Sequence, residues 1–410
     1  MHKIAGYLIR YHRNKQAISQ EGLCKGICVV SYLSKIEQGL VQPSTEIIKQ
    51  LFQRLSLTYF DDPKQLRKAR SLLDSFFEKL DMRQQPQEEF QKLKKLEKSL
   101  LCSPLCVDVL LANAFMLGFE QFTESLKDNI KEYAKNLHSL KGIMNEQQLF
   151  LYYMFFGCLV YEVGKESIQS LKKAGMYQQS SHQQFHLGYQ YYYLGKQSKA
   201  VECYGKAYYL ASEEGNAPLM MEAALHLGNC YCMYQRDQEL MYKYYHRCIK
   251  LAKVIGKEEI QAVVYYNIGS SFLSWGMLEE AKSYLERSVV YLNDNDDERV
   301  LYYQKLALVY CEMEADEKMK KALAQAKHEM HQQTSDLFRY MQIFVELHCE
   351  ETTRYQKEYV EALEHICFKE DMISYGFRNF HIPYLICAYK KQRRYKEALQ
   401  LKEETDCKFS

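Results

Sequence analysis

The chain has 410 residues, of which 47% are hydrophobic and 26% are charged, with 54 Lys and Arg against 52 Asp and Glu. This composition is typical of a folded globular protein and excludes a mainly disordered chain. The apolar stretch over residues 149–161 is shorter than the roughly 18–20 residues needed to cross a bilayer, so no transmembrane helix is expected. The charged N-terminus lacks the apolar segment of a secretory signal, and we expect a cytoplasmic protein.

Basic charge is concentrated at the N-terminal end. Residues 1–60 contain eight Lys and Arg and three Asp and Glu, a net charge of +5, whereas the whole chain carries +2 and the other 350 residues therefore carry −3. This asymmetry favours a small N-terminal module that faces a polyanion; the alternative is a surface that is merely basic. The run Asp61-Asp62-Pro63 interrupts the pattern, and we expect the first domain to span residues 1–62.

Four short helices are predicted in this segment, over residues 4–12, 19–25, 30–37 and 45–55. In the third helix, Leu33 and Ile36 can face the core, while the opposite side carries small polar side chains, one valine and one cation. Such a helix can enter the major groove of DNA and read base edges. The residues on that side are Val30, Ser31, Ser34 and Lys35. The candidates for phosphate contacts are Arg10, Arg13 and Gln20.

The motifs of this segment resemble the Xre/Cro-like helix-turn-helix. The residues that carry the resemblance are Ser19-Gln20-Glu21, Ser31-Tyr32-Leu33-Ser34-Lys35-Ile36-Glu37-Gln38-Gly39 and Gln42-Pro43-Ser44. By position, the resemblance implies phosphate contacts from Gln20 and Ser44. It also implies base contacts from the third helix, at Val30, Ser31, Ser34 and Lys35. At Val29 the sequence departs from this family, which usually has a Ser or Thr cap there.

Residues 63–105 are predicted to form a linker helix region. Apolar residues recur there at helical spacing, from Leu66 to Leu80, and give an amphipathic stripe. Such a helix can dock the N-terminal module on the body that follows.

A repeat marks the larger part of the chain. Leu187-Gly188-x2-Tyr191 recurs as Leu227-Gly228-x2-Tyr231 and as Ile268-Gly269-x2-Phe272. The pattern resembles the tetratricopeptide repeat, in which a small residue lets two helices cross closely. With only six prolines in the chain, we expect an all-α fold. Residues 106–410 are then a right-handed tetratricopeptide-repeat superhelix that follows the helix-turn-helix domain.

A superhelix of this kind has a concave face, which binds extended peptides. In tetratricopeptide domains that grip peptides, asparagines at adjacent repeat positions bond the peptide backbone, because an amide both donates and accepts. Asn229 and Asn267 occupy such positions. Lys305 lies where a cation can meet a peptide carboxylate, and His186 and His226 occupy corresponding positions. The alternative is that the two asparagines bond to a loop or a neighbouring helix.

The sequence contains no motif of catalysis. It has no GxxxxGK[ST] phosphate loop, no HExxH zinc helix and no GxSxG nucleophile turn. The 14 cysteines are dispersed without a CxxC pair, and we expect reduced thiols that pack in the interior. We therefore expect no enzyme, no metal site and no cofactor.

The combination of the two parts resembles the peptide-responsive regulators of the Rgg, Rap, NprR, PlcR and PrgX (RRNPP) superfamily, most closely the PlcR and NprR branch. The resemblance implies a cytoplasmic transcription factor of quorum sensing. It implies a short signalling peptide in the concave face, double-stranded DNA with an inverted-repeat operator as a partner, and a homodimer joined through the repeats. The alternative is an adaptor whose repeats bind a folded protein such as a response regulator.

Overall fold

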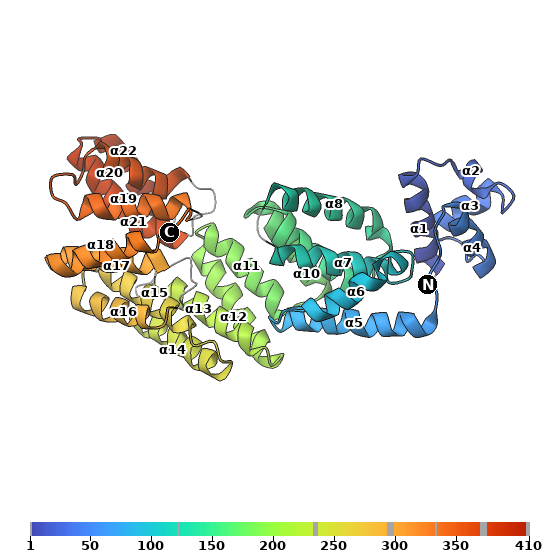
Figure 1. Ribbon diagram of the computed structural model, residues 1–410, viewed down its shortest axis with the longest axis horizontal. Coiled ribbons are helices and arrows are strands. Elements are labelled where there is room, and N and C mark those ends of the chain that lie inside the picture. The colour runs from blue at the N-terminus through green and yellow to red at the C-terminus, as the bar shows by residue number, and fades with distance from the viewer. Residues whose placement is uncertain are drawn as a thin grey trace. The chain divides into compact units, whose positions relative to one another are not determined.

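The computed structural model describes residues 2–120, 123–232, 237–292, 299–332, 334–369 and 375–406. Over these ranges the regular structure is helical and contains no strand, which confirms the predicted all-α fold. The chain divides into two compact units, Met1–Leu187 and Gly188–Ser410. Figure 1 shows the helices of both units.

The first unit begins with a four-helix domain. Its helices are α1 (His2–Lys15), α2 (Gln20–Cys24), α3 (Val30–Glu37) and α4 (Thr45–Arg54), close to the predicted ranges. The Ser19 and Ser44 hydroxyls accept hydrogen bonds from backbone N–H groups at the starts of α2 and α4, whereas Val29 at the start of α3 provides no side-chain cap. As predicted, Leu33 and Ile36 are buried.

The rest of the first unit is a helical layer that continues the core of the four-helix domain. Its helices are α5 (Pro63–Asp81), α6 (Gln87–Leu100), α7 (Cys106–Met116), α8 (Glu124–Leu140), α9 (Glu146–Phe155) and α10 (Lys165–Tyr177). The expected linker region therefore forms two helices, which pack with α7 around Leu73 and Phe76. One hydrophobic cluster contains Leu8 and Phe52 of the four-helix domain together with Leu137 of α8.

The second unit is built from helical pairs, which lie side by side in Figure 1. The helix α11 (Ser181–Tyr193) runs across the division between the units. The helices that follow are α12 (Gln197–Glu213), α13 (Ala217–Cys230), α14 (Gln238–Val254), α15 (Ile260–Ser274), α16 (Leu278–Val290), α17 (Arg299–Glu312), α18 (Asp316–His328), α19 (Asp336–His348), α20 (Lys357–Glu364), α21 (Tyr375–Lys391) and α22 (Tyr395–Asp406).

The repeated glycines lie where the paired helices of the second unit cross. A Cβ at Gly228 of α13 would lie 2.5 Å from the ring of Tyr245 of α14, and one at Gly269 of α15 would lie 2.6 Å from Leu285 of α16. Carbon atoms do not approach this closely, so the glycines permit the crossing. The period in the sequence thus follows from the packing of each pair.

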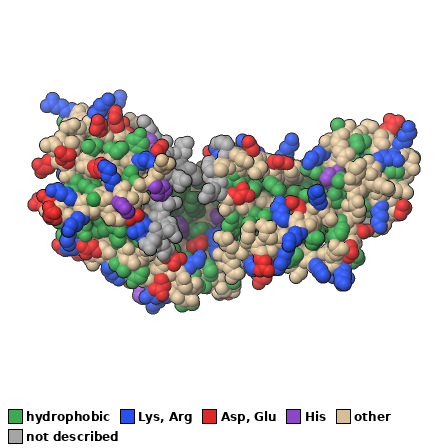
Figure 2. Space-filling model, viewed as in Figure 1, with side chains coloured by type: hydrophobic (Ala, Val, Ile, Leu, Met, Phe, Trp, Pro, Cys, Tyr) green, Lys and Arg blue, Asp and Glu red, His purple; other side chains and the backbone are tan. Residues whose placement is uncertain are grey.

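No helix among the described residues is long and apolar enough to span a membrane. On the face shown in Figure 2, acidic and basic side chains are interspersed.

Candidate functional site

The helix α3 presents the predicted DNA-reading side to solvent. Val30 is 41% exposed, and Ser31 and Lys35 are also exposed. Ser34 is half-buried, and its hydroxyl accepts a hydrogen bond from Nε2 of Gln38 at 3.2 Å. The four predicted residues therefore share a side of α3 that faces away from the core, and Lys35 gives this side one positive charge. Their contacts with bases remain a prediction.

Arg13 and Gln20 both bond to Glu37 inside the four-helix domain. The Arg13 guanidinium donates from Nε to Oε1 of Glu37 at 2.6 Å and from Nη2 to Oε2 at 2.9 Å, and Nη1 donates to the carbonyl of Ile18 at 2.9 Å. Nε2 of Gln20 donates to Oε2 of Glu37 at 2.8 Å. The hydrogen bond to Glu37 raises the pKa of Arg13. These contacts hold α1 and α2 on α3, and phosphate contacts from the two side chains remain a prediction.

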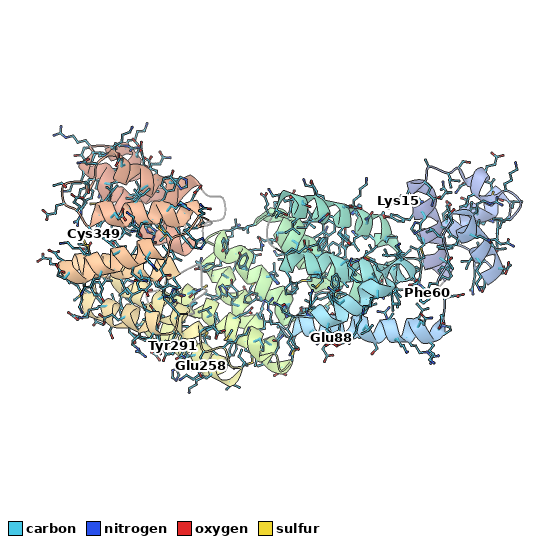
Figure 3. All side chains as sticks on the ribbon, viewed as in Figure 1. Lys15, Phe60, Glu88, Glu258, Tyr291 and Cys349 are labelled. Atoms are coloured by element: carbon cyan, nitrogen blue, oxygen red, sulfur yellow. The ribbon has the colours of Figure 1, made fainter. Side chains whose placement is uncertain are left out.

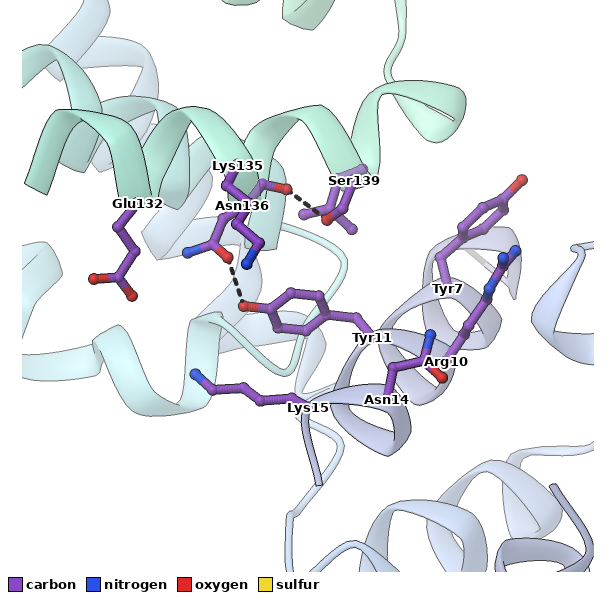
Figure 4. Close-up of a pocket in the computed structure, with 10 residues that line it drawn as sticks. Tyr7, Arg10, Tyr11, Asn14, Lys15, Glu132, Lys135, Asn136 and Ser139 are labelled. Carbon is purple, nitrogen blue, oxygen red and sulfur yellow. Dashed lines mark hydrogen bonds between the residues drawn. The ribbon is translucent and has the colours of Figure 1, made fainter. Parts of the chain in front are cut away.

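Arg10 and Ser44 keep groups that can bind an anion. Arg10 is exposed, and with Lys15 of α1 and Lys135 of α8 it lines a cavity of about 800 Å³, drawn in Figure 4. Across this cavity the Tyr11 hydroxyl donates to Oδ1 of Asn136 at 3.0 Å. The Ser44 hydroxyl accepts from the N–H of Ile47 at 3.3 Å and can still donate its own proton.

In the second unit, the structure brings two of the predicted peptide-binding residues together. Nδ2 of Asn267 on α15 donates to Oδ1 of Asn229 on α13 at 2.9 Å, and the Tyr245 hydroxyl donates to the same Oδ1 at 2.7 Å. Both asparagines are half-buried. Within the described part of the chain, no protein group bonds to Nδ2 of Asn229 or to Oδ1 of Asn267. The pair therefore keeps a donor and an acceptor side by side.

Lys305 on α17 has a buried amino group. Its side chain is 2% exposed, and Nζ lies 3.1 Å from the centroid of the Phe380 ring. Burial lowers the pKa of Lys305 well below its usual value, because the charged ammonium loses its hydration. The ring face offsets part of that loss through a cation–π contact. This position would favour an anionic partner.

The two predicted histidines lie in different units. His226 on α13 stacks on Tyr204, with ring centroids 4.9 Å apart. His186 belongs to the first unit, where burial lowers its pKa well below the usual value and the positive charge of Arg83 lowers it further. His186 is therefore favoured in its neutral form.

Sequence reasoning missed a second pair of amides. Nε2 of Gln304 on α17 donates to Oε1 of Gln342 on α19 at 3.1 Å and to the carbonyl of Phe338 at 2.9 Å. Both glutamines are buried. The available signal was a glutamine among mainly apolar residues in each helix. Among the described residues, no group of three or more His, Cys, Asp or Glu side chains is placed to hold a metal ion.

Comparison with known proteins gives related sequences and folds. Residues 9–60 match the helix-turn-helix family. The chain is 24% identical over 405 residues to the transcriptional activator NprA of Geobacillus stearothermophilus, covering 92% of this chain and 96% of NprA.

The structure resembles a Rap protein complexed with competence and sporulation factor, with a TM-score of 0.64 and 12% identity over 83% of this chain and 98% of that one. It also resembles the apo quorum sensor NprR from B. thuringiensis, with a TM-score of 0.62 and 16% identity over 84% of this chain and 99% of that one. These likenesses confirm the predicted architecture of a helix-turn-helix domain and a tetratricopeptide-like body. The chain thus combines a match to the helix-turn-helix family at residues 9–60 with similarity to the transcriptional activator NprA along nearly its whole length.

Proposed function

We propose that the chain is a cytoplasmic transcriptional regulator that binds operator DNA through α3 and responds to a short signalling peptide. The peptide is held in the second unit on Asn229 and Asn267, and its binding changes the affinity of the protein for DNA. The function involves no catalytic step and no cofactor.

The observation that carries the peptide part is the asparagine pair. Asn229 keeps an N–H donor and Asn267 keeps a carbonyl acceptor, and the two amides are fixed to each other at 2.9 Å. A peptide bond offers one acceptor and one donor, so it complements this pair. In support, NprR was solved in complex with its cognate peptide NprX, and its fold resembles that of this chain with a TM-score of 0.60, 16% identity and coverage of 82% of this chain.

Lys305 supplies a counter-charge for a carboxylate of the peptide. An isolated buried ammonium is costly, and a carboxylate beside it would offset that cost. His226 is a further candidate contact in this unit, whereas His186 of the first unit stays a separate prediction.

The DNA part of the proposal depends on the exposed side of α3 and on the match of residues 9–60 to the helix-turn-helix family. Proteins of this kind insert the second helix of the motif into the major groove, and dimers bind two half-sites. We infer a homodimer on an inverted-repeat operator. The adaptor alternative leaves the helix-turn-helix domain without a role and is not favoured.

Fluorescence anisotropy with DNA from upstream of the gene tests the proposal. The full chain is titrated onto the DNA with and without short synthetic peptides from the C-termini of small adjacent reading frames. We expect a salt-sensitive affinity that changes roughly 5–150-fold with the cognate peptide, a coupling of about 1–3 kcal/mol. DNA binding indifferent to every peptide would contradict the peptide part, and the absence of sequence-specific binding would favour the adaptor.

Variants separate the two sites. Lys35→Ala and Ser34→Ala should weaken DNA binding and leave peptide binding intact. Asn267→Ala should weaken peptide binding and leave DNA binding without peptide intact, and Gln238→Ala is its control, because Gln238 is an exposed amide on α14. Equal loss of both activities in one variant would indicate misfolding, which circular dichroism detects.

A further inference from the structure

At the end of α17, Cys311 and Glu312 face the end of α19. The residues opposite them are His348 and Cys349. Nε2 of His348 lies 2.8 Å from Oε1 of Glu312, and Nδ1 of His348 lies 2.9 Å from the hydroxyl of Tyr359. Beside this contact between His348 and Glu312, the thiol of Cys349 donates a hydrogen bond to the sulfur of Cys311. Figure 3 labels Cys349 in the second unit. The histidine contact thus holds the two helix ends together where the sulfurs meet.

A cation is fixed against one sulfur of this pair. Nη2 of Arg354 lies 3.6 Å from Sγ of Cys311, and its Nε donates to the backbone carbonyl of His348 at 2.6 Å. The guanidinium is therefore anchored to the end of α19 while it faces the end of α17. A positive charge and a thiol donor at one sulfur both favour its thiolate form.

The two sulfurs consequently have different character. The hydrogen bond from Cys349 lowers the pKa of Cys311 against the effect of burial, and the charge of Arg354 lowers it further. The same hydrogen bond raises the pKa of Cys349, which stays protonated. By contrast, burial raises the pKa of Cys248 to about 12 and that of Cys367 to about 12. Cys311 and Cys349 are both partly exposed, so a small oxidant can reach them.

We propose that Cys311 and Cys349 form a peroxide-responsive dithiol that closes to a disulfide between the ends of α17 and α19. The Cys311 thiolate attacks one oxygen of hydrogen peroxide, the O–O bond breaks, and hydroxide leaves to give a sulfenic acid at Cys311. The sulfur of Cys349 then attacks the Cys311 sulfur as its S–H proton passes to the departing oxygen, and water leaves as the S–S bond forms. The two thiols lose two electrons in total, and the peroxide is reduced to two molecules of water. A thiol reductant reverses the reaction by exchange.

Mass-spectrometric mapping of the full chain tests this inference. The reduced protein is treated with stoichiometric hydrogen peroxide, its remaining thiols are alkylated, and it is digested without reductant. We expect a peptide that links Cys311 to Cys349 and lacks two hydrogen masses, and we expect its loss after dithiothreitol. A folded wild-type protein whose two cysteines stay fully alkylated would overturn the proposal.

Single substitutions assign the roles. In Cys349→Ser, the oxidation should stop at a sulfenic acid on Cys311 that dimedone traps, whereas Cys311→Ser should slow the reaction with peroxide by about tenfold or more. Cys387→Ser is the control, because Cys387 is a partly exposed thiol of the same unit that donates to the Tyr355 hydroxyl instead. Cross-linking to Cys387 in the wild type, or oxidation of Cys311→Ser at the wild-type rate, would contradict the assignment. If a variant fails to fold, the mass-spectrometric mapping of the wild-type protein still tests the proposal.

Discussion

Glu37 is a single side chain that joins three helices of the helix-turn-helix domain. Its carboxylate accepts hydrogen bonds from Arg13 and Gln20, and its side chain is 3% exposed. Removal of one member of a buried ion pair leaves the other charge without compensation. We predict that Glu37→Ala lowers the free energy of local opening of α1 and α3 by about 3–5 kcal/mol.

Native-state hydrogen exchange of the amides in α1 and α3 measures this loss locally. The control is Lys35→Ala, two residues away on the exposed side of α3, which should change the opening free energy by less than about 0.5 kcal/mol. Similar effects of the two substitutions would show that the ion pair contributes nothing to the domain.

Lys305 should make the stability of the second unit depend on pH. Its pKa in the folded chain is well below 10.5, whereas the unfolded chain has the ordinary value. Between these two values the unfolded state binds the proton that the folded state lacks, so the free energy of unfolding rises with pH. The cost of the buried ammonium is therefore complete below the folded pKa and disappears as the pH approaches about 10.4.

We predict that Lys305→Met removes the contribution of Lys305 to the rise of the free energy of unfolding with pH. Methionine has a similar length and no charge. Urea unfolding from neutral pH to about pH 10 compares the variant with the wild type. Lys250→Met, at an exposed position on α14, should leave the pH dependence of the free energy of unfolding as in the wild type. If the free energy of unfolding of Lys305→Met changed with pH as it does in the wild type, burial would not destabilise the ammonium.

At the scale of elements, the glycines of the repeat give a matched comparison. A Cβ at Gly228 would lie 2.5 Å from the Tyr245 ring, whereas a Cβ at Gly205 on α12 would meet nothing within 4 Å. We predict that Gly228→Ala costs about 1–3 kcal/mol through overpacking. Gly205→Ala should instead stabilise its helix by up to about 1 kcal/mol, because alanine is the better helix former. Thermal unfolding of the two variants gives the sign of each effect, and equal signs would refute the packing argument.

The sequence was sufficient to predict the helices but only part of the site. Helix periodicity and capping gave the range of α3 and the burial of Leu33, because both are local properties. They did not reveal that Glu37 binds Arg13 and Gln20, since that contact joins helices whose crossing no local pattern specifies. Likewise, the repeat numbering singled out the two asparagines, whereas their direct hydrogen bond depends on how successive pairs stack.

At the scale of the whole molecule, the proposed function requires two copies of α3 on one DNA duplex. A single recognition helix contacts few base pairs, and two-fold symmetric dimers bind half-sites about one helical turn, or roughly 34–36 Å, apart. An insertion of about five base pairs between the half-sites would rotate one of them to the opposite side of the duplex.

We predict that this insertion weakens binding by the full chain at least about tenfold, because only one recognition helix can then reach its half-site. An insertion of about ten base pairs restores the rotational phase and should weaken binding less. Native mass spectrometry should find two chains on the uninterrupted operator. If the affinity did not depend on the spacing and the complex had the mass of one chain per DNA, the protein would act as a monomer. The prediction of an inverted-repeat operator would then be wrong as well.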